Sequence, residues 1–288
     1  MDQPQPTARD AQFLGSIPEL YDRCLGPFLF APLAADLAGR VILPRDRPPR
    51  LLEIAAGTGR LTERLLERLP AGGALVATDL NDPMLALART RIASADTAGA
   101  VEFRAPVDAM ELPFADGEFD AVVCQLGVMF FPDKPRAARE ALRVLRSGGQ
   151  WIFNVMASLD ENPMGRIVND VVGKIFPVDP PTFFRVPFSF PAPEGLRALA
   201  ADAGFEAVEV TDVERTAESP SAEEAAYGFV CGNPGIITIR ERGVDSRVVV
   251  DALRDALVRE FGDHPLRLPL RARVLSARKP AHADGGWA

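Results

Sequence analysis

Two glycines and a carboxylate in the first half of the chain have the residue types and spacing of a nucleotide site. The apolar run Leu51–Ala56 ends in Gly57-Thr58-Gly59 and passes into a stretch with helical periodicity. An open α/β sheet builds nucleotide sites in this way, and glycine lets the backbone approach a ligand because it has no Cβ. Asp79 lies about 20 residues further on, at the end of the next apolar run, where it can accept hydrogen bonds from ribose hydroxyls. The sequence therefore predicts an adenosine-type ligand.

Thr62 and Glu53 indicate which kind of nucleotide ligand the site would bind. A dinucleotide fingerprint that starts at Gly57 requires glycine or alanine where the chain has the branched Thr62. A phosphate-binding turn has little use for Glu53, a carboxylate inside the preceding strand. A cationic ligand is different, because a buried carboxylate beside an ammonium or sulfonium group offsets the desolvation of both charges. The chain also lacks the G-x-x-x-x-G-K-[ST] pattern, so a P-loop is not favoured.

Further segments extend the pattern in a fixed order through residues 50–156. They are Val101–Arg104, Asp108–Phe114, Phe119–Gln125 and Ala138–Gly149. Together with the glycine turn, these segments resemble the class I S-adenosylmethionine (SAM)-dependent methyltransferases, in particular the ubiquinone/menaquinone-biosynthesis-like (methyltransferase type 11) branch. A glycine motif alone would be weak evidence for this family, whereas several segments in the expected order make the resemblance specific. Ala55 departs from the family, which often has glycine there, and we expect only a modest displacement of the ligand.

The resemblance implies a set of cofactor contacts. Asp79 would hold the ribose, Leu80 would pack on the adenine, and Asp108 would lie at the adenine amino group. Asp79 and Asp108 could instead cap helices, and Gln125 could merely end a strand rather than reach the methionine part of SAM. The expected cofactor-binding residues are Tyr21, Glu53, Ala55, Gly57, Gly59, Asp79, Leu80, Met84, Asp108, Ala109 and Gln125.

Aromatic residues outside these motifs are candidates for the acceptor side. In related methyltransferases a tyrosine on an N-terminal helix closes over the cofactor, and the ring of Tyr21 could meet the sulfonium favourably. The segment 176–190 is rich in phenylalanine and could be core or an apolar acceptor pocket. The candidate substrate contacts are Phe130, Phe183 and Phe184. No catalytic residue is assigned, because the sulfonium is already activated and a base is needed only for some acceptors.

Alternating strands and helices from Leu51 to about Val155 predict a parallel sheet with helices on both faces. The expected fold class is α/β, a Rossmann-like class I methyltransferase with a seven-stranded mostly parallel sheet, an antiparallel edge strand and helical lid insertions. The expected division is an N-terminal helical segment closing over the cofactor (1–45), a SAM-binding core (46–157), lid and acceptor-binding insertions with part of the sheet (158–265), the final edge strand (266–280) and a tail (281–288).

Composition favours one large cytoplasmic domain. The chain has 288 residues, 47% of them hydrophobic, and its formal charge of −8 argues against nucleic-acid binding. Three widely separated cysteines predict reduced thiols, with no disulfide framework and no metal site. The N-terminus lacks the plan of a signal peptide, and no apolar stretch is long enough to span a bilayer. The sequence leaves homodimer formation open.

The expected function is transfer of a methyl group from SAM to an O, N or C nucleophile of a small, rather apolar acceptor. Tyr21, the segment 158–192 and the helices of 220–262 would form a roof over the methyl group. One alternative is a SAM-binding protein with a pericyclic or regulatory role, because its binding motifs would be unchanged. A nicotinamide-dependent oxidoreductase is a second alternative, which Thr62 and Glu53 disfavour.

Overall fold

The structure is a computed structural model that describes residues 10, 13–93, 98–190 and 192–281. The expected C-terminal tail, apart from Ala281, and most of the first 12 residues lie outside the described part. Within it, no helix is long and apolar enough to cross a membrane.

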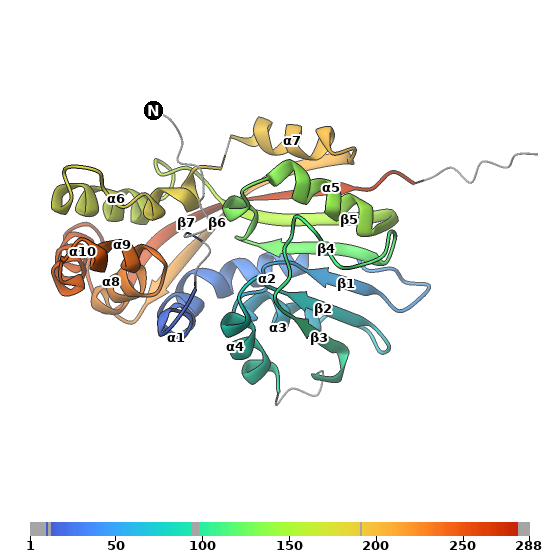
Figure 1. Ribbon diagram of the computed structural model, residues 1–288, viewed down its shortest axis with the longest axis horizontal. Coiled ribbons are helices and arrows are strands. Elements are labelled where there is room, and N and C mark those ends of the chain that lie inside the picture. Colours follow the sequence, from blue (N-terminus) through green and yellow to red (C-terminus); the bar gives the residue numbers. More distant parts are fainter. Residues whose placement is uncertain (1–9, 11–12, 94–97, 191, 282–288) are drawn as a thin grey trace, which may run out of the picture.

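Seven strands form one sheet in the order β3-β2-β1-β4-β5-β7-β6 (Figure 1). The strands are β1 (Arg50–Glu53), β2 (Ala74–Thr78), β3 (Val101–Arg104), β4 (Phe119–Gln125), β5 (Leu145–Met156), β6 (Glu206–Ser219) and β7 (Leu266–Arg278). Strands β1 to β5 pair in parallel, and β7 runs antiparallel to both of its neighbours. The strand order reverses between β1 and β4, and open α/β sheets bind ligands at the carboxyl ends of the strands beside such a switch point.

The expected fold class is confirmed, with one correction to the place of the antiparallel strand. Residues 266–278 form β7, which is antiparallel as expected but lies between β5 and β6 rather than at the edge. The edge is β6, which pairs with β7 over Glu206–Ser219. Buried residues dominate the second half of β7, whereas most of β6 is exposed and carries charges, as edge strands usually do.

Helices cover both faces of the sheet. The set α2 (Ala31–Gly39), α3 (Arg60–Leu66) and α4 (Asp82–Ile92) lies on one face, and α5 (Lys134–Val144) and α7 (Pro193–Asp202) lie on the other (Figure 1). Short 3-10 turns occur at η3 (Ala98–Ala100) and η4 (Val128–Phe130). A large apolar core, with Trp151, Phe119 and Phe153 among its largest members, joins the sheet to most of these helices. A small separate cluster of Ala56, Ala77, Leu85 and Ala88 packs α4 on the sheet.

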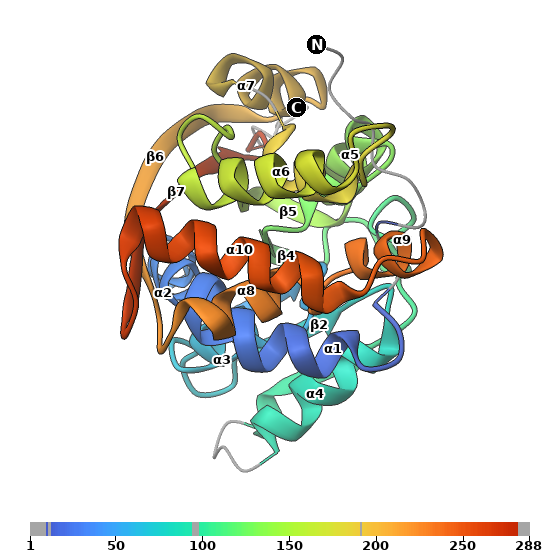
Figure 2. The ribbon, with the colours of Figure 1, turned by 90° about the vertical axis from the view of Figure 1, so that its left-hand side faces the viewer.

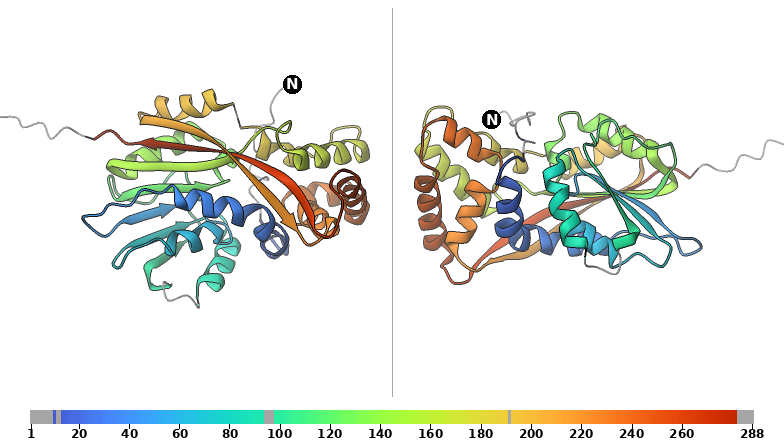
Figure 3. Two further views of the ribbon diagram at one scale, coloured as in Figure 1. Left: turned by 180° about the vertical axis from the view of Figure 1, so that it is seen from behind. Right: turned by 60° about the horizontal axis from the view of Figure 1, so that its bottom comes forward.

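A second group of helices lies beyond the carboxyl ends of the strands. It contains α1 (Ile17–Leu20), the π-helix η2 (Tyr21–Phe30), α6 (Pro163–Ile175), η5 (Phe183–Phe188), α8 (Ala222–Cys231), α9 (Gly235–Glu241) and α10 (Ser246–Phe261). Helix α10 lies between α6 and α8, and α8 contacts η2 (Figure 2). The β6–β7 ribbon extends past the rest of the sheet to reach α8 and α10 (Figure 3). This placement sets the helices across the end of the sheet where a ligand is expected.

Candidate active site

A cavity of about 330 Å³ opens at the carboxyl ends of β1, β2 and β4. Its volume is in the range of small-molecule sites. Ten of the expected site positions line it: Tyr21, Ala55, Gly57, Asp79, Leu80, Met84, Asp108, Ala109, Gln125 and Phe130. We call this space the cofactor cavity. Glu53 and Gly59 do not line it.

The two glycines of the turn serve different purposes. Gly57 has a φ of +57°, and the only atom within 4 Å of a Cβ added there would be the Met84 Cε, at 3.7 Å. A side chain at Gly57 would therefore project into the cavity. Gly59 has a φ of +83°, and a Cβ there would lie 2.8 Å from the Ala88 Cβ on α4. Gly59 thus lets the start of α3 pack closely on α4, so its contribution is to packing.

Ala55 shows how the chain accommodates its departure from the family. Its φ is +54°, a left-handed conformation that alanine rarely adopts, and Leu126, which also lines the cavity, has a φ of +52°. A Cβ at Gly127 would lie 2.7 Å from the Ala55 Cβ. The absence of a side chain at Gly127 therefore makes room for the Ala55 methyl. Strained backbone at two positions that line one cavity is typical of functional sites.

Asp79 lies at the end of β2 with only 7% of its surface exposed. Its Oδ2 accepts a hydrogen bond from the Gly57 N–H at 2.8 Å, and its Oδ1 accepts one from the Asn81 N–H at 2.8 Å. Burial raises the pKa of this carboxyl, and these backbone donors oppose the shift. A carboxylate oxygen has two acceptor sites, so Oδ2 keeps one for a hydroxyl from the cavity. Oδ1 also accepts a long hydrogen bond from the Asn81 Nδ2, at 3.4 Å, which a second hydroxyl would displace.

Glu53 lies behind the glycine turn. It is 1% exposed, and its Oε2 accepts a hydrogen bond from the Thr62 Oγ1 at 2.7 Å. Burial raises the pKa of Glu53 to about 8, the Thr62 hydroxyl opposes the shift, and Asp79 adds to it. Thr62, which argued against a dinucleotide site, is therefore the partner of this carboxyl. The expected contact of Glu53 with the cofactor stays a prediction.

The expected adenine-side residues surround one end of the cavity. Leu80 leaves 52% of its surface exposed, while Met84 and Ala109 are buried. The Asp108 Oδ1 accepts a hydrogen bond from the Met110 N–H at 2.8 Å, so this carboxylate also stabilises its own turn. An exposed leucine beside an exposed carboxylate offers an apolar platform and a hydrogen-bond acceptor to a planar base.

Tyr21 and Gln125 close the other end. The Tyr21 ring stacks on Phe30 with centroids 4.5 Å apart and meets the edge of Phe13 at 5.4 Å. Burial, with additional effects from Asp79 and Asp22, holds the pKa of Tyr21 above its usual value, so the hydroxyl keeps its proton. The Gln125 Nε2 donates a hydrogen bond to the Phe30 carbonyl at 2.7 Å and ties the end of η2 to β4.

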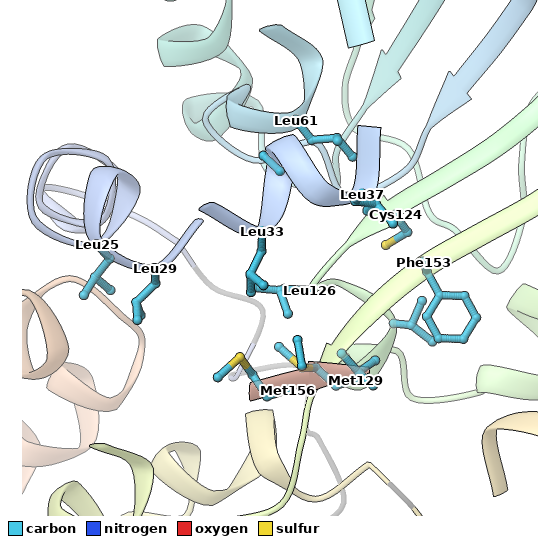
Figure 4. Close-up of a cluster of buried hydrophobic side chains, with 14 of the residues drawn as sticks. Leu25, Leu29, Leu33, Leu37, Leu61, Cys124, Leu126, Met129, Phe153 and Met156 are labelled. Atoms are coloured by element: carbon cyan, nitrogen blue, oxygen red, sulfur yellow. The ribbon is translucent and has the colours of Figure 1, made fainter. Parts of the chain in front are cut away.

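A second cavity, of about 100 Å³, adjoins the first, and we call it the apolar cavity. Phe13, Tyr21, Leu126 and Phe130 line both. Phe183 and Phe184 line the apolar cavity, and the Phe183 ring stacks on Phe130 with centroids 6.0 Å apart. Met129 and Met156 also line the apolar cavity. Figure 4 shows them gathered with Leu126 near Leu33 of α2.

Polar groups are few in the apolar cavity. Among the described residues that line it, only Tyr21, Asn162 and Asn233 carry polar side chains, and none is a carboxylate, histidine, lysine or arginine. Asn162 is paired with the backbone of Arg271, because its Nδ2 donates to the carbonyl at 3.0 Å and its Oδ1 accepts from the N–H at 2.9 Å. Asn233 donates to the Phe229 carbonyl and accepts from the Gly235 N–H at 2.9 Å. The cavity therefore suits an uncharged ligand.

The sequence analysis missed several lining residues of the cofactor cavity. They are Phe13, Asn81, Val107, Met110, Leu126, Gly127, Phe131 and Pro132. Most of them follow an expected site residue by one or two positions. Their closeness in sequence to those residues could have identified them as lining residues. It also missed Asp22, Thr58, Arg60 and Arg91, which form one ion-paired cluster beside the turn.

The fold and the site define a class of protein before any comparison. A sheet in the order 3-2-1-4-5-7-6, with a nucleotide-sized cavity, a glycine turn and an acidic residue at the end of β2, is the arrangement of the class I methyltransferases. The cavity fits their cofactor, because Gly57 leaves its floor open, the Asp79 Oδ2 offers a free acceptor site and Leu80 offers an apolar surface.

Comparisons with known proteins agree with this class. Residues 52–153 match a family described as a methyltransferase domain. The ubiquinone/menaquinone biosynthesis C-methyltransferase UbiE of Ectopseudomonas mendocina is 35% identical over 55% of this chain and 66% of its own length. The demethylmenaquinone methyltransferase of Thermus thermophilus is 35% identical over 55% of this chain and 74% of its own. The crystal structure of the (4+2)-cyclase SpnF superposes with a TM-score of 0.62 at 20% identity, covering 96% of this chain and 97% of that one.

The chain belongs to the class I SAM-dependent methyltransferases, in the branch that contains the ubiquinone/menaquinone-biosynthesis enzymes. SAM is the cofactor of this family. The match spans about two thirds of the length of the first curated relative.

Proposed function

We propose that the protein transfers the methyl group of SAM to a small, uncharged and largely apolar acceptor. One observation carries this proposal: the cofactor cavity and the apolar cavity adjoin, and Tyr21, Leu126, Phe130 and Phe13 belong to both walls. A methyl donor in one cavity and an acceptor in the other would meet at these residues. Alignment of two reactants with exclusion of water is the main contribution a protein makes to such a displacement.

Each part of the site has a task in this proposal. Asp79 accepts hydrogen bonds from the ribose hydroxyls, Leu80 packs on the adenine and Asp108 accepts a hydrogen bond from its amino group. Bound SAM supplies an activated methyl group on sulfur. Tyr21 stays protonated and places its ring at the junction, where an aromatic face favours a cation. Segment 158–192 and the helices of 220–262 form the roof over the acceptor.

The lining of the apolar cavity restricts the acceptor. A cationic amine would be desolvated there without a carboxylate to compensate it, which is costly. With no base in the lining, the nucleophile has to be a carbon, an aprotic atom or a hydroxyl that ionises unaided. The relatives named as ubiquinone/menaquinone biosynthesis C-methyltransferases support a carbon or phenolate nucleophile on an apolar ring.

A product screen tests the proposal. The protein with SAM is incubated with phenols, quinols, prenylated rings and amines, and S-adenosylhomocysteine is measured by mass spectrometry. We expect product with at least one neutral ring compound and none with the amines. Product formed preferentially with cationic amines would contradict the assigned acceptor class.

A second candidate is a SAM-binding protein that catalyses a pericyclic reaction. The similarity to the (4+2)-cyclase SpnF over nearly the whole of both chains favours it, as does an apolar cavity without a base. The same screen separates the two functions. A pericyclic enzyme would consume its substrate while SAM stays intact, whereas a methyltransferase releases one S-adenosylhomocysteine for each acceptor molecule.

A further inference from the structure

We propose that Asp22 is a positioning residue, which latches the π-helix η2 onto the glycine turn and thereby holds Tyr21 across the cofactor cavity. The inference rests on the proposed function only in taking SAM as the ligand of that cavity. It concerns how the lid is held closed, and it assigns a task to the ion cluster beside the turn.

Asp22 joins η2 to three residues of the cofactor-binding region. Its Oδ1 accepts a hydrogen bond from the Thr58 Oγ1 at 2.8 Å and one from the Arg60 Nε at 3.2 Å. Its Oδ2 accepts from the Arg91 Nη2 at 2.7 Å. Thr58 lies in the glycine turn, and Arg60 and Arg91 belong to α3 and α4, the helices that flank it. One carboxylate therefore contacts the turn and both supporting helices.

The contacts form closed loops, which fixes their geometry. The Arg91 Nε donates to the Thr58 carbonyl at 3.0 Å, so Arg91 contacts both the turn and the lid residue bound to it. The Arg60 Nη2 donates to the Asp22 carbonyl at 3.0 Å. A Cβ at Gly26 would lie 2.6 Å from the Arg60 Nη2, so a side chain there would displace the guanidinium from its present position.

The charge balance makes Asp22 the critical member. In the described part of the chain, Asp22 is the one carboxylate that both arginines contact, and their side chains are only 18% exposed. Burial lowers the pKa of Arg60, Asp22 opposes the shift and Arg91 adds to it. Without the Asp22 charge, two partly buried arginines would face each other, and the arrangement would relax by moving the lid away. Charge-assisted hydrogen bonds at such exposure are stronger than neutral ones.

The latch acts on the cavity through Tyr21, its neighbour in the chain. Tyr21 lines the cofactor cavity and stacks on Phe30 at the far end of η2, where Gln125 holds the Phe30 carbonyl. The lid is therefore pinned to the turn at its first residues and to β4 at its last. A lid that opens for exchange of cofactor has to release the Asp22 end or the Phe30 end.

Dissociation of S-adenosylhomocysteine measures the latch without knowledge of the acceptor. Stopped-flow displacement gives the dissociation rate for the wild type, Asp22→Asn, Tyr21→Ala and the double variant. We expect Asp22→Asn, which keeps the size of the side chain, to dissociate about tenfold faster. Because Asp22 acts through Tyr21, the double variant should be no faster than Tyr21→Ala alone. Arg91→Gln, which weakens the same cluster from α4, should also accelerate dissociation.

Asp120 provides a matched control. It accepts hydrogen bonds from the Arg146 Nη1 at 2.7 Å and the Arg50 N–H at 2.7 Å, and it is also paired with Arg47. This second carboxylate with two arginines lines neither cavity. Asp120→Asn should lower the free energy of unfolding and leave the dissociation rate unchanged.

Two outcomes would overturn the latch. One is a dissociation rate for both Asp22→Asn and Arg91→Gln that equals the wild-type rate. The other is additive acceleration in the Asp22 and Tyr21 double variant, which would show that Asp22 acts independently of the tyrosine. These two outcomes leave the proposed function standing, whereas a wild type that binds no S-adenosylhomocysteine would overturn the proposed function and the latch together.

Discussion

The cofactor cavity and the apolar cavity adjoin but are built in different ways. Most of the cofactor cavity comes from residues 55–132, where glycines, strand ends and backbone groups present fixed hydrogen-bonding positions. The apolar cavity collects side chains from η2, η4, α6, η5, α8 and β7, which are far apart in the chain. One cavity can recognise a constant ligand by fixed atoms, and the other can recognise a variable ligand by shape. A change in the roof can therefore alter the acceptor while the cofactor site stays intact.

Their electrostatics differ in the same way. Two carboxylates, Asp79 and Asp108, line the cofactor cavity. The described lining of the apolar cavity has no charged side chain. A carboxylate-rich site favours a cation such as a sulfonium, and an uncharged one excludes ions. Substitutions at residues that line only one cavity should therefore leave binding in the other nearly unchanged.

The largest expected effect is loss of SAM binding in Gly57→Val. A branched side chain would project into the space next to Met84, and we expect a loss greater than that of any single hydrogen bond. Gly148→Val is the matched control, because Gly148 also has a positive φ, of +73°, but lies away from both cavities. Calorimetric titration with SAM should show wild-type affinity for the control only. Equal affinities for the two variants would remove Gly57 from the site.

Asp79→Ala should weaken SAM binding by about 2–4 kcal/mol. It removes two charge-assisted hydrogen bonds from the ribose hydroxyls, and the energies of such bonds are not fully additive. The control is Asp82→Ala, which removes an exposed carboxylate paired with Arg89. The same titration measures both variants. SAM affinity within twofold of the wild type in Asp79→Ala would contradict ribose binding.

Phe183→Leu should reduce acceptor turnover about tenfold and leave SAM affinity within twofold. A lost packing contact in an apolar pocket costs about 1–3 kcal/mol, and a swap between large apolar residues usually preserves the fold. Phe205→Leu is the control, since Phe205 is equally buried but stacks on Trp151 away from both cavities. If Phe183→Leu lowers SAM binding and turnover together, segment 176–190 is ordinary core rather than a roof.

The smallest effect concerns the pH dependence of stability. Between the ordinary pKa of 4.5 and about 8, Glu53 is ionised in the unfolded chain and protonated in the folded one. Over this window the free energy of unfolding falls as pH rises, by about 1.4 kcal/mol per pH unit from this group. Urea unfolding at pH 6 and pH 7 should show a smaller fall in Glu53→Gln than in the wild type. If the free energy of unfolding falls equally in the two proteins, Glu53 is ionised in the folded protein.

Sequence patterns predicted the cofactor side because its residues are local. Asp79 directly follows β2, Gln125 is the last residue of β4 and Gly57 lies in the turn after β1, and parallel strands bring their ends together. The pattern could not tell a residue that lines the cavity from one that lies beneath its lining. Gly59 packs on Ala88, Glu53 lies beneath the turn with Thr62, and their expected contacts with the cofactor stay predictions.

The other features of the structure depend on contacts between residues far apart in the sequence, which leave no local pattern. Asp22 meets Arg91 across 69 positions of sequence, and neither residue stands out among the many charges of the chain. The order of β6 and β7 depends on which amphipathic strand pairs with β5, which alternation alone does not specify. Phe183 and Phe130 were candidates by composition, but only the fold stacks them.

A crystal structure of the protein with S-adenosylhomocysteine tests most directly whether the two cavities form one reaction site. We expect the ribose hydroxyls on Asp79 and the sulfur directed toward the junction of the cavities, beside Tyr21 and Phe130. The sulfur should face the apolar cavity with no protein side chain between them. A nucleoside bound elsewhere, or a sulfur directed away from Phe130, would contradict the proposed division between a cofactor cavity and an acceptor cavity.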